Sequence, residues 1–149
     1  MTAARPFRLT VPEPLEFDIH KTCAQVLDRL LAEPAIWACY PAGAVQLSRQ
    51  QAARYSTLGL KRGMPDLLIF FEGVWGIELK RYRGRLSKAR IVSTRRGSPR
   101  ILEGQEEIFP KLIAAGFKGI AICTSVDEML AQIKRWGIPL RNYTGADQM

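Results

Sequence analysis

The feature that most constrains this chain is a predicted β-hairpin with charged residues at its open end. An apolar run from Asp66 to Phe71 is bounded by Pro65 and Gly73, as is typical of a short buried strand. We expect residues 72–76 to turn and residues 75–82 to return as a second strand. The two strands should therefore pair antiparallel in one sheet.

The predicted pairing brings two carboxylates and one ammonium group to the same end of that sheet. Side chains alternate along a strand, so Glu78 and Lys80 share one face while Ile77 and Leu79 take the other. Asp66 begins the first strand and is separated from Glu78 by eleven residues. An antiparallel hairpin of this length returns Glu78 and Lys80 to the level of Asp66.

Three such groups suit metal-assisted cleavage of a phosphodiester. Asp66 and Glu78 would repel each other unless a cation lay between them, and Mg²⁺ typically takes one or two carboxylates plus phosphate oxygens and water. Lys80 can hold the attacking water and offset developing negative charge. The alternative is an ordinary pair of Glu78 and Lys80 on a sheet face, since three-residue patterns recur by chance. The surrounding sequence has to decide between the two interpretations.

Composition and charge favour a single domain with a nucleic-acid partner. The 149 residues are 47% hydrophobic, enough for one α/β domain with a real core. The net charge of +8 predicts a polyanionic partner, either nucleic acid or an anionic membrane surface. Residues 81–100 contain eight Lys or Arg and no acid. Because this segment follows the predicted catalytic strand directly, it favours a phosphate backbone.

No apolar run approaches the length of a membrane span, and residues 1–14 lack the apolar centre of a secretory signal. We therefore expect a cytoplasmic protein with no membrane partner. Cys23, Cys39 and Cys123 are widely spaced and form no Cys-x-x-Cys pair, so they are interpreted as reduced core residues.

The remaining chain predicts further helices and strands around the hairpin. Apolar residues recur at helical spacing from Glu16 towards Pro34, and Gly59 and Gly116 are placed to end two later helices. Trp75 and Trp136 are interpreted as packing residues. The expected elements are an extended arm at 1–14, helices at 16–33, 50–58, 105–115 and 126–135, the last capped by Ser125, and further strands at 36–40 and 119–124.

Four motifs in order resemble a known nuclease family. They are Gly-Leu-Lys-Arg-Gly-Met-Pro-Asp-Leu-Leu-Ile at 59–69, Gly-Ile-Glu-Leu-Lys at 76–80, Gly-Arg-Leu-Ser at 84–87 and Ser-Val-Asp-Glu at 125–128. Together they resemble the virus-type replication-repair nuclease (VRR-NUC) domain of the PD-(D/E)XK superfamily, over residues 15–138. The resemblance implies a restriction-endonuclease-like core, with a mixed sheet of about four strands flanked by helices. It also implies a Mg²⁺- or Mn²⁺-dependent DNA nuclease of the phage or bacterial kind.

The resemblance also implies roles for individual residues. Asp66 and Glu78 match the metal-binding carboxylates, Lys80 matches the lysine, and the Leu79 carbonyl would be a further metal ligand. An acidic residue of the first helix often completes the family's metal site. Glu16 is the better candidate than Asp18 because it shares a face with Ile19 and His20. The alternative for Glu16 is a carboxylate that interacts only with the helix dipole.

The chain departs from the family pattern after Ser87. A glutamine is expected within a few residues, whereas the first one here is Gln105, so we infer an inserted segment at about 88–104. Gln105 would then be the matching residue, and the insertion would form either a basic hairpin along DNA or a solvated loop. The candidate DNA-contacting residues are Lys61, Arg62, Arg81, Arg83, Arg85, Lys88, Arg90, Arg95 and Arg96.

The sequence thus predicts a metal-dependent DNA endonuclease, followed by a C-terminal tail at 139–149. The resemblance further implies a homodimer that acts on duplex or branched DNA, including four-way junctions. Two alternatives remain open. One is a noncatalytic DNA-binding module on the same scaffold, and the other is a subunit of a phage DNA-processing complex.

Overall fold

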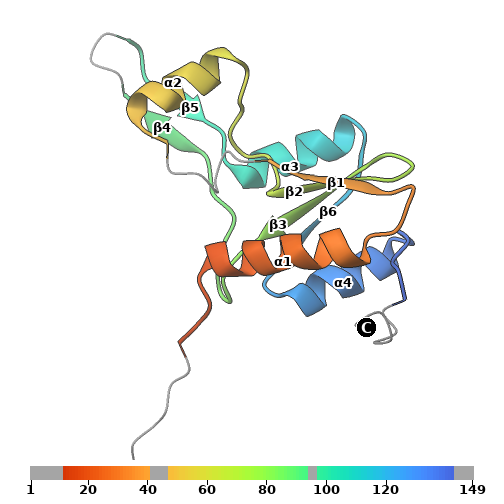
Figure 1. Cartoon of the computed structure of the whole chain (residues 1–149). Helices are drawn as coiled ribbons and strands as arrows, with labels where there is room; N and C mark the ends of the chain where they lie inside the picture. The colour runs from red at the N-terminus through yellow and green to blue at the C-terminus, as the bar shows by residue number, and fades with distance from the viewer. Residues whose placement is uncertain (1–11, 41–46, 94–96, 143–149) are drawn as a thin grey trace, which may run out of the picture.

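The structure is a computed structural model that describes residues 12–40, 47–93 and 97–142. A four-stranded mixed sheet has helices on both sides: α1 (Glu16–Leu30) and α4 (Val126–Arg135) cover one face, and α3 (Gln105–Ala114) lies beside β6 on the other (Figure 1). The α/β class predicted from the sequence, with a mixed sheet flanked by helices, is confirmed.

The sheet has the order β1-β2-β3-β6. β1 (Ile36–Cys39), β2 (Leu67–Phe70) and β3 (Val74–Leu79) form an antiparallel meander, and β6 (Phe117–Cys123) adds parallel to β3. The predicted hairpin is therefore the β2–β3 pair at the centre of the sheet. Both of its strands are shielded from the sheet edges by β1 and β6.

The turn of this hairpin is shorter than predicted. The prediction of a turn at 72–76 was wrong, because β3 already begins at Val74. Glu72 and Gly73 have positive φ angles of 47° and 136°, and the Phe71 N–H donates to the Gly73 carbonyl at 3.0 Å. Two left-handed residues reverse the chain in fewer steps than an ordinary loop. The second strand also ends earlier than Tyr82, at Leu79.

The apolar core lies between the sheet and the α1–α4 layer. Leu67 and Ile69 of β2 and Ile77 and Leu79 of β3 are fully buried on this side, as period-two alternation predicts. Helix α1 adds its apolar stripe, and α4 adds Met129 and Ile133. The rest of the core consists of Ile19, Cys23, Leu27, Leu31, Ala35, Cys123 and Ile138.

Two predictions about individual side chains meet different outcomes. Trp75 and Trp136 pack together with ring centroids 4.9 Å apart, which confirms their role in packing. Cys23 and Cys123 are buried free thiols, and burial raises their pKa values to about 11 and about 12. Cys39 is exposed, so its assignment to the core was wrong. Cys39 shares the face of its partner Leu67, but it lies on the edge strand β1, where its thiol stays exposed.

The predicted helices are confirmed to within a few residues. The Ser48 hydroxyl accepts a hydrogen bond from the Gln51 N–H at the start of α2 (Arg49–Thr57), and the Ser125 hydroxyl accepts from the Glu128 N–H at the start of α4. Gly116, at φ 121°, follows α3 in the conformation that ends a helix. The first helix stops at Leu30, earlier than Pro34 suggested.

The chain after α4 remains part of the fold beyond residue 138. The Ala32 N–H donates to the Pro139 carbonyl at 3.0 Å, and the Arg141 N–H donates to the Leu30 carbonyl at 2.7 Å. The boundary predicted for the tail was therefore too early. The predicted arm at 1–14 lies mostly outside the described residues. Within the described ranges, no helix is long and apolar enough to cross a membrane.

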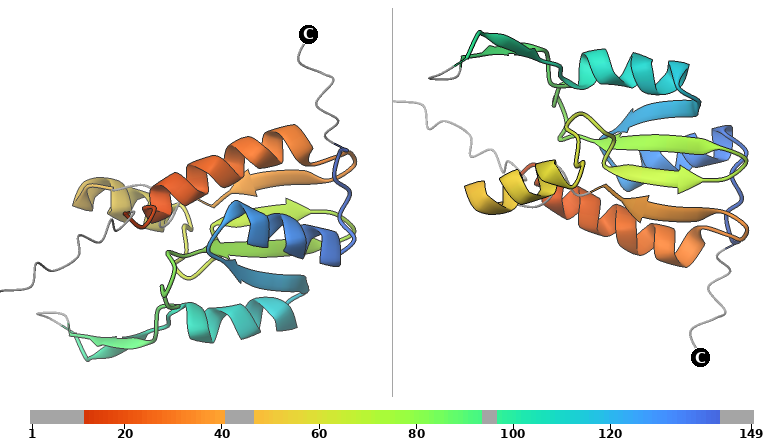
Figure 2. Two further views of the ribbon diagram at one scale, coloured as in Figure 1. Left: turned by 90° about the horizontal axis from the view of Figure 1, so that it is seen from below. Right: turned by 90° about the horizontal axis from the view of Figure 1, so that it is seen from above.

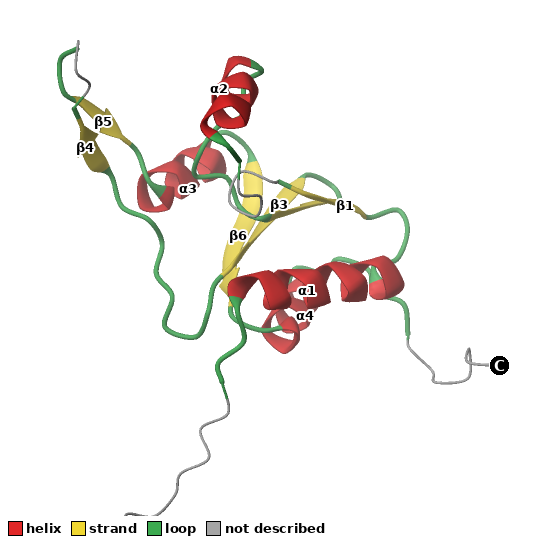
Figure 3. Cartoon of the chain, turned by 60° about the vertical axis from the view of Figure 1, so that its left-hand side comes forward, coloured by secondary structure: helices red, strands yellow, loops and turns green. Residues whose placement is uncertain are grey.

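The segment at about 88–104, interpreted above as an insertion, contains a separate two-stranded sheet, so it forms a hairpin as one interpretation predicted. Its course along DNA stays a prediction. β4 (Arg90–Val92) pairs antiparallel with β5 (Arg100–Leu102). This hairpin and α2 both extend from the end of the central sheet at which β2 begins and β3 ends (Figures 2 and 3). Arg95 and Arg96, which come between β4 and β5 in the sequence, lie outside the described residues.

Candidate active site

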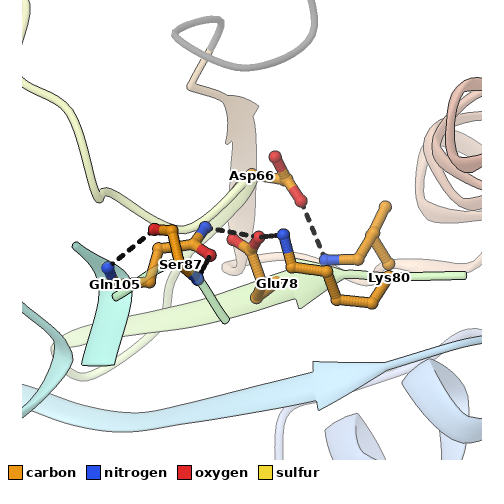
Figure 4. Close-up of polar contacts among 6 residues, drawn as sticks. Asp66, Glu78, Lys80, Ser87 and Gln105 are labelled. Atoms are coloured by element: carbon orange, nitrogen blue, oxygen red, sulfur yellow. Dashed lines mark hydrogen bonds and ion pairs between the residues drawn. The ribbon is translucent and has the colours of Figure 1, made fainter. Parts of the chain in front are cut away.

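The β2–β3 pairing places the two predicted carboxylates side by side. Leu67 is opposite Ile77, so the next step along the register sets Asp66 opposite Glu78. Since Leu67 and Ile77 face the core, Asp66 and Glu78 face the other side of the sheet. The Asp66 Oδ2 accepts a hydrogen bond from the Leu79 N–H at 2.8 Å (Figure 4). The predicted meeting of these residues at one end of the sheet is confirmed.

Glu78 is the central residue of the site, and only 1% of it is exposed. Its Oε1 accepts from the Lys80 ammonium at 2.7 Å and from the Gln105 amide nitrogen at 2.5 Å (Figure 4). Its Oε2 is buried and has no hydrogen-bond partner among the described residues. A buried carboxylate oxygen without a donor is costly, so this atom is available to a ligand.

The two carboxylates are destabilised in their charged form. Burial raises the pKa of Asp66, and the charge of Glu16 adds to this, although the Leu79 N–H and Lys80 act in the opposite direction. Burial and the charge of Asp66 likewise raise the pKa of Glu78, against the effects of Lys80 and Gln105. One lysine does not fully neutralise the site, which leaves room for further positive charge.

Lys80 remains protonated in this environment. Burial acts to lower its pKa, but the bond to Glu78 and the charges of Glu78, Glu16 and Asp66 raise the pKa above its ordinary value. The side chain therefore serves as a fixed cation and hydrogen-bond donor. It is not set up as a neutral base while Glu78 is ionised.

Gln105 reaches Glu78 from the first turn of α3, across the loop that leads into the inserted hairpin. Its side-chain oxygen accepts from the Ser87 N–H at 3.1 Å, and its backbone N–H donates to the Ser87 hydroxyl at 2.9 Å (Figure 4). The side-chain amide is thus bonded at its oxygen to Ser87 and at its nitrogen to Glu78, so the NH₂ group is held towards Glu78. The prediction that Gln105 belongs to the site is supported by its position, and its partner is Glu78.

A cavity of about 320 Å³ opens over these groups. Asp66, Glu78, Lys80 and Gln105 line it together with the exposed Glu16 of α1. Basic side chains from two other segments, Arg62, Lys88 and Arg90, also line it, beside the acidic Glu103. The cavity therefore has two carboxylates on the sheet, with both cationic and acidic groups around them. That arrangement fits a ligand that brings both a metal ion and phosphate oxygens.

Several other predicted residues do not line this cavity. Lys61, Arg81, Arg83 and Arg85 are exposed. The Arg81 guanidinium pairs with Glu13 at 3.4 Å, and that of Arg83 lies 5.7 Å from the centre of the Tyr82 ring. Their contacts with DNA stay predictions.

Three residues of the site were not assigned a role from the sequence. Ser87 binds Gln105, as described above. Glu107 accepts from the Gly104 N–H at 2.8 Å and from the Ala89 N–H at 3.2 Å, which ties the hairpin base to α3. A carboxylate three residues after Gly104 is half of a capping box, a pattern that could have identified Glu107. Nothing comparable marks Gly104, which packs against the Ser87–Lys88 backbone.

The donor set suits a small, hard cation with an incomplete protein shell. Among the described residues, no group of three or more His, Cys, Asp or Glu side chains is gathered around one point. Asp66 and Glu78 provide two carboxylates, and the unpartnered Oε2 of Glu78 is an oxygen ligand without a competing donor. Mg²⁺ is commonly held by one or two carboxylates, with water and substrate phosphate as its other ligands. The residues present fit that ion.

Comparisons of the chain with protein-family models, with curated proteins and with solved structures found no match.

Proposed function

We propose that this protein is a divalent-metal-dependent DNA endonuclease with a VRR-NUC-type site on a restriction-endonuclease-like core. The observation that carries the proposal is the arrangement of Asp66, Glu78 and Lys80 at one end of the β2–β3 pair, in a cavity edged by basic side chains. A site for a small organic acid would not place two carboxylates where the ligand's negative charge must lie. A phosphodiester accompanied by a metal ion satisfies both halves of the cavity.

Each residue of the site has a distinct role in this mechanism. Asp66 and Glu78 would hold Mg²⁺ or Mn²⁺, with Glu16 at the edge of the cavity as a further acidic group. The bound ion supplies Lewis-acid stabilisation of the phosphate charge and lowers the pKa of water. Lys80 orients the attacking water and donates to a non-bridging phosphate oxygen. Gln105 keeps the Glu78 carboxylate in one orientation through their hydrogen bond.

The basic residues of the cavity wall define where the nucleic acid approaches. Arg62 precedes β2, while Lys88 and Arg90 belong to the base of the inserted hairpin. A strand running between these two segments would pass over Asp66 and Glu78. Branched DNA as the substrate, Mg²⁺ or Mn²⁺ as the cofactor and a homodimer as the active form are part of the same proposal, on the basis of the sequence resemblance.

The test is cleavage of labelled duplex, flap and four-way-junction DNA with and without Mg²⁺. The wild-type protein should cut at least one substrate in Mg²⁺ and none in EDTA. Lys80→Ala and Glu78→Gln should each lower the rate by about 10²-fold or more. Asp18→Asn is the matched control, because Asp18 is an exposed α1 carboxylate outside the cavity. Equal cutting by all variants would exclude the proposed site.

A noncatalytic DNA-binding module is the second candidate, and one observation favours it. Lys80 and Gln105 already occupy Glu78 Oε1, so the isolated site is partly neutralised without a metal ion. A binding module predicts tight DNA association with no cleavage of any substrate in Mg²⁺ or Mn²⁺. It also predicts that Glu78→Gln strengthens DNA binding, because the substitution removes a negative charge from a surface that binds phosphate.

A further inference from the structure

The inserted hairpin has two faces of different chemistry. Arg90 is opposite Leu102 and Val92 is opposite Arg100, so these four residues share one face. Arg90 and Leu102 line the cavity, which identifies this face as the one towards the site. Ile91 and Ile101 are opposite each other and take the reverse face. The face towards the site, called the basic face below, carries Arg90 and Arg100 beside the apolar Leu102 and Val92, whereas the reverse face is apolar only.

The isoleucine pair is unusually open to solvent. Ile91 is 73% exposed and Ile101 is 70% exposed, although both are β-branched apolar residues at the centre of their strands. Neither β4 nor β5 joins the central sheet. A two-stranded hairpin is marginally stable alone, so this face gains from a partner that covers it. The chemistry of that partner must combine apolar surface with negative charge nearby.

The base of the hairpin is held firmly against α3. The Glu106 N–H donates to the Ser87 carbonyl at 3.1 Å, and the Ala89 N–H donates to Glu107. The Gly104 backbone lies directly on residues 87–88. The direction in which the hairpin leaves the site is therefore set by a packed junction. Figure 1 shows it extending beyond the end of the central sheet.

From these observations, and resting on the proposed function, we infer that the β4–β5 hairpin is a strand-separating wedge. Its basic face holds the scissile DNA strand towards Asp66 and Glu78, and its Ile91–Ile101 face stacks on the first base pair of the adjoining duplex. Exposed isoleucines have no hydrogen-bonding groups with which to contact base edges, whereas apolar wedges of this kind occupy unstacked base steps. Phosphates beside the bases complement the nearby Lys88, Arg90 and Arg100.

The position of the wedge has a consequence for the cut. Ile91 and Ile101 are each adjacent in sequence to a residue that lines the cavity, Arg90 and Leu102 respectively. One residue of strand spans about 3.3 Å, less than the spacing of successive phosphates in an extended DNA strand. The scissile phosphate should therefore lie within a few nucleotides of the junction between single-stranded and duplex DNA. The strand that passes on the basic face is the one that is cut.

The experiment uses forked DNA that carries 2-aminopurine either at the first base pair of the duplex or deep within it. Fluorescence is measured with the full-length protein in EDTA, so that the DNA is not cut. Binding should raise the signal at the first base pair and not at the internal one. The double substitution I91T/I101T should abolish this rise and weaken binding about tenfold, since it removes apolar surface that the base pair would cover.

Threonine keeps the β-branched shape, so I91T/I101T should preserve the hairpin. Ile36→Thr is the matched control, because Ile36 is 66% exposed on β1, away from the hairpin, and it should behave as wild type. An unchanged fluorescence rise and affinity in I91T/I101T would overturn the wedge. A homodimer in sedimentation that I91T/I101T dissociates would overturn it too, by assigning this face to a second copy of the chain.

Cleavage of the same fork in Mg²⁺ separates this inference from the proposed function. Cutting near the junction by wild-type protein, with cutting that is slower or displaced in I91T/I101T, supports both. Cutting by wild-type protein without local unstacking overturns the wedge and leaves the nuclease proposal standing. Unstacking without cutting in any metal overturns the nuclease proposal and retains the wedge as a feature of a DNA-binding protein.

Discussion

Glu78 shows how a single side chain is prepared for a ligand. One carboxylate oxygen is saturated by Lys80 and Gln105, and the other is buried without a donor. These two contacts favour the ionised carboxylate, against the opposing effects of burial and of the Asp66 charge, and they fix its orientation. The buried oxygen without a donor lowers the stability of the fold, and a bound cation would restore that stability. The residue is therefore positioned for binding at the expense of stability.

Asp66 offers a direct test of how much stability the buried carboxylates cost the fold. Its pKa is raised in the folded state, mainly by burial, so its contribution to stability is complete below its ordinary pKa and is lost as pH rises through the folded-state value. Asp66→Asn keeps an oxygen acceptor for the Leu79 N–H while removing the charge. We expect the variant to be about 1 kcal/mol more stable at pH 7, with the gain disappearing below about pH 4.

Thermal unfolding at both pH values, with and without Mg²⁺, measures the effect. Mg²⁺ should raise the melting temperature of the wild-type protein, and raise that of Asp66→Asn much less. Asp18→Asn should respond to Mg²⁺ as the wild type does. An Asp66→Asn protein that is less stable than wild type at pH 7 would contradict the assigned cost.

At the scale of elements, the junction between the 87–89 segment and the start of α3 governs both the site and the hairpin. Ser87 and Gln105 exchange two hydrogen bonds, and Gly104 fits between them because it has no side chain. Its φ of −100° is available to any residue, so the close packing alone requires glycine here. This junction couples the orientation of Glu78 to that of the hairpin through α3.

Gly104→Ala should disrupt this junction. An added Cβ would collide with the Ser87 carbonyl oxygen and lie 2.6 Å from the Lys88 carbonyl carbon. We expect a loss of about 2 kcal/mol in the free energy of unfolding, measured by urea denaturation, because overpacking displaces backbone. Cleavage should also slow, since Gln105 is displaced from Glu78.

Gly116→Ala is the control at the opposite end of the same helix. Gly116 has φ of 121° and nothing within 4 Å of an added Cβ, so this substitution introduces backbone strain without a collision. It should lower stability by about 1 kcal/mol and leave the cleavage rate unchanged. Equal effects of both variants on cleavage would show that general destabilisation, and not the junction, is responsible.

For the whole molecule, much of the excess positive charge lies in the segment that follows β3 in the sequence. The chain carries a net +8, and the segment from Arg81 to Arg100 holds eight basic residues and no acid. Asp66 and Glu78 lie at the end of the central sheet where β2 begins and β3 ends, and α2 and the hairpin extend beyond that end (Figure 2). Long-range attraction thus directs a polyanion towards the end of the sheet at which Asp66 and Glu78 lie.

Salt dependence of DNA binding should report this distribution. Replacing Lys88, Arg90 and Arg100 together by Gln should reduce the slope of log K against log salt by about three, because each of these side chains would neutralise one phosphate. Arg29, Lys134 and Arg135 are exposed on the α1–α4 face, and their triple Gln variant is the control with the same net charge. Identical slopes for the two variants would indicate nonspecific attraction only.

The sequence by itself determined the features that depend on near neighbours. Alternation along 66–71 and 77–80 separated the core residues from the charged ones, and the caps at Ser125 and Gly116 placed two helix ends. The sequence also placed Asp66 and Glu78 at the same end of the hairpin, although the turn between the strands was predicted too long. The exact register was not predicted, since the left-handed conformation of Glu72 has no strong sequence signal.

Only the tertiary structure decided the contacts between distant segments. The bond between Gln105 and Glu78 closes a loop of 27 residues, and neither residue specifies the other by its spacing. The same holds for Gly104 against Ser87, for the exposure of Cys39 on an edge strand and for the two faces of the inserted hairpin. Secondary structure is set by local periodicity and turn chemistry. The neighbours of each element are set by how the apolar faces pack, which is a property of the whole chain.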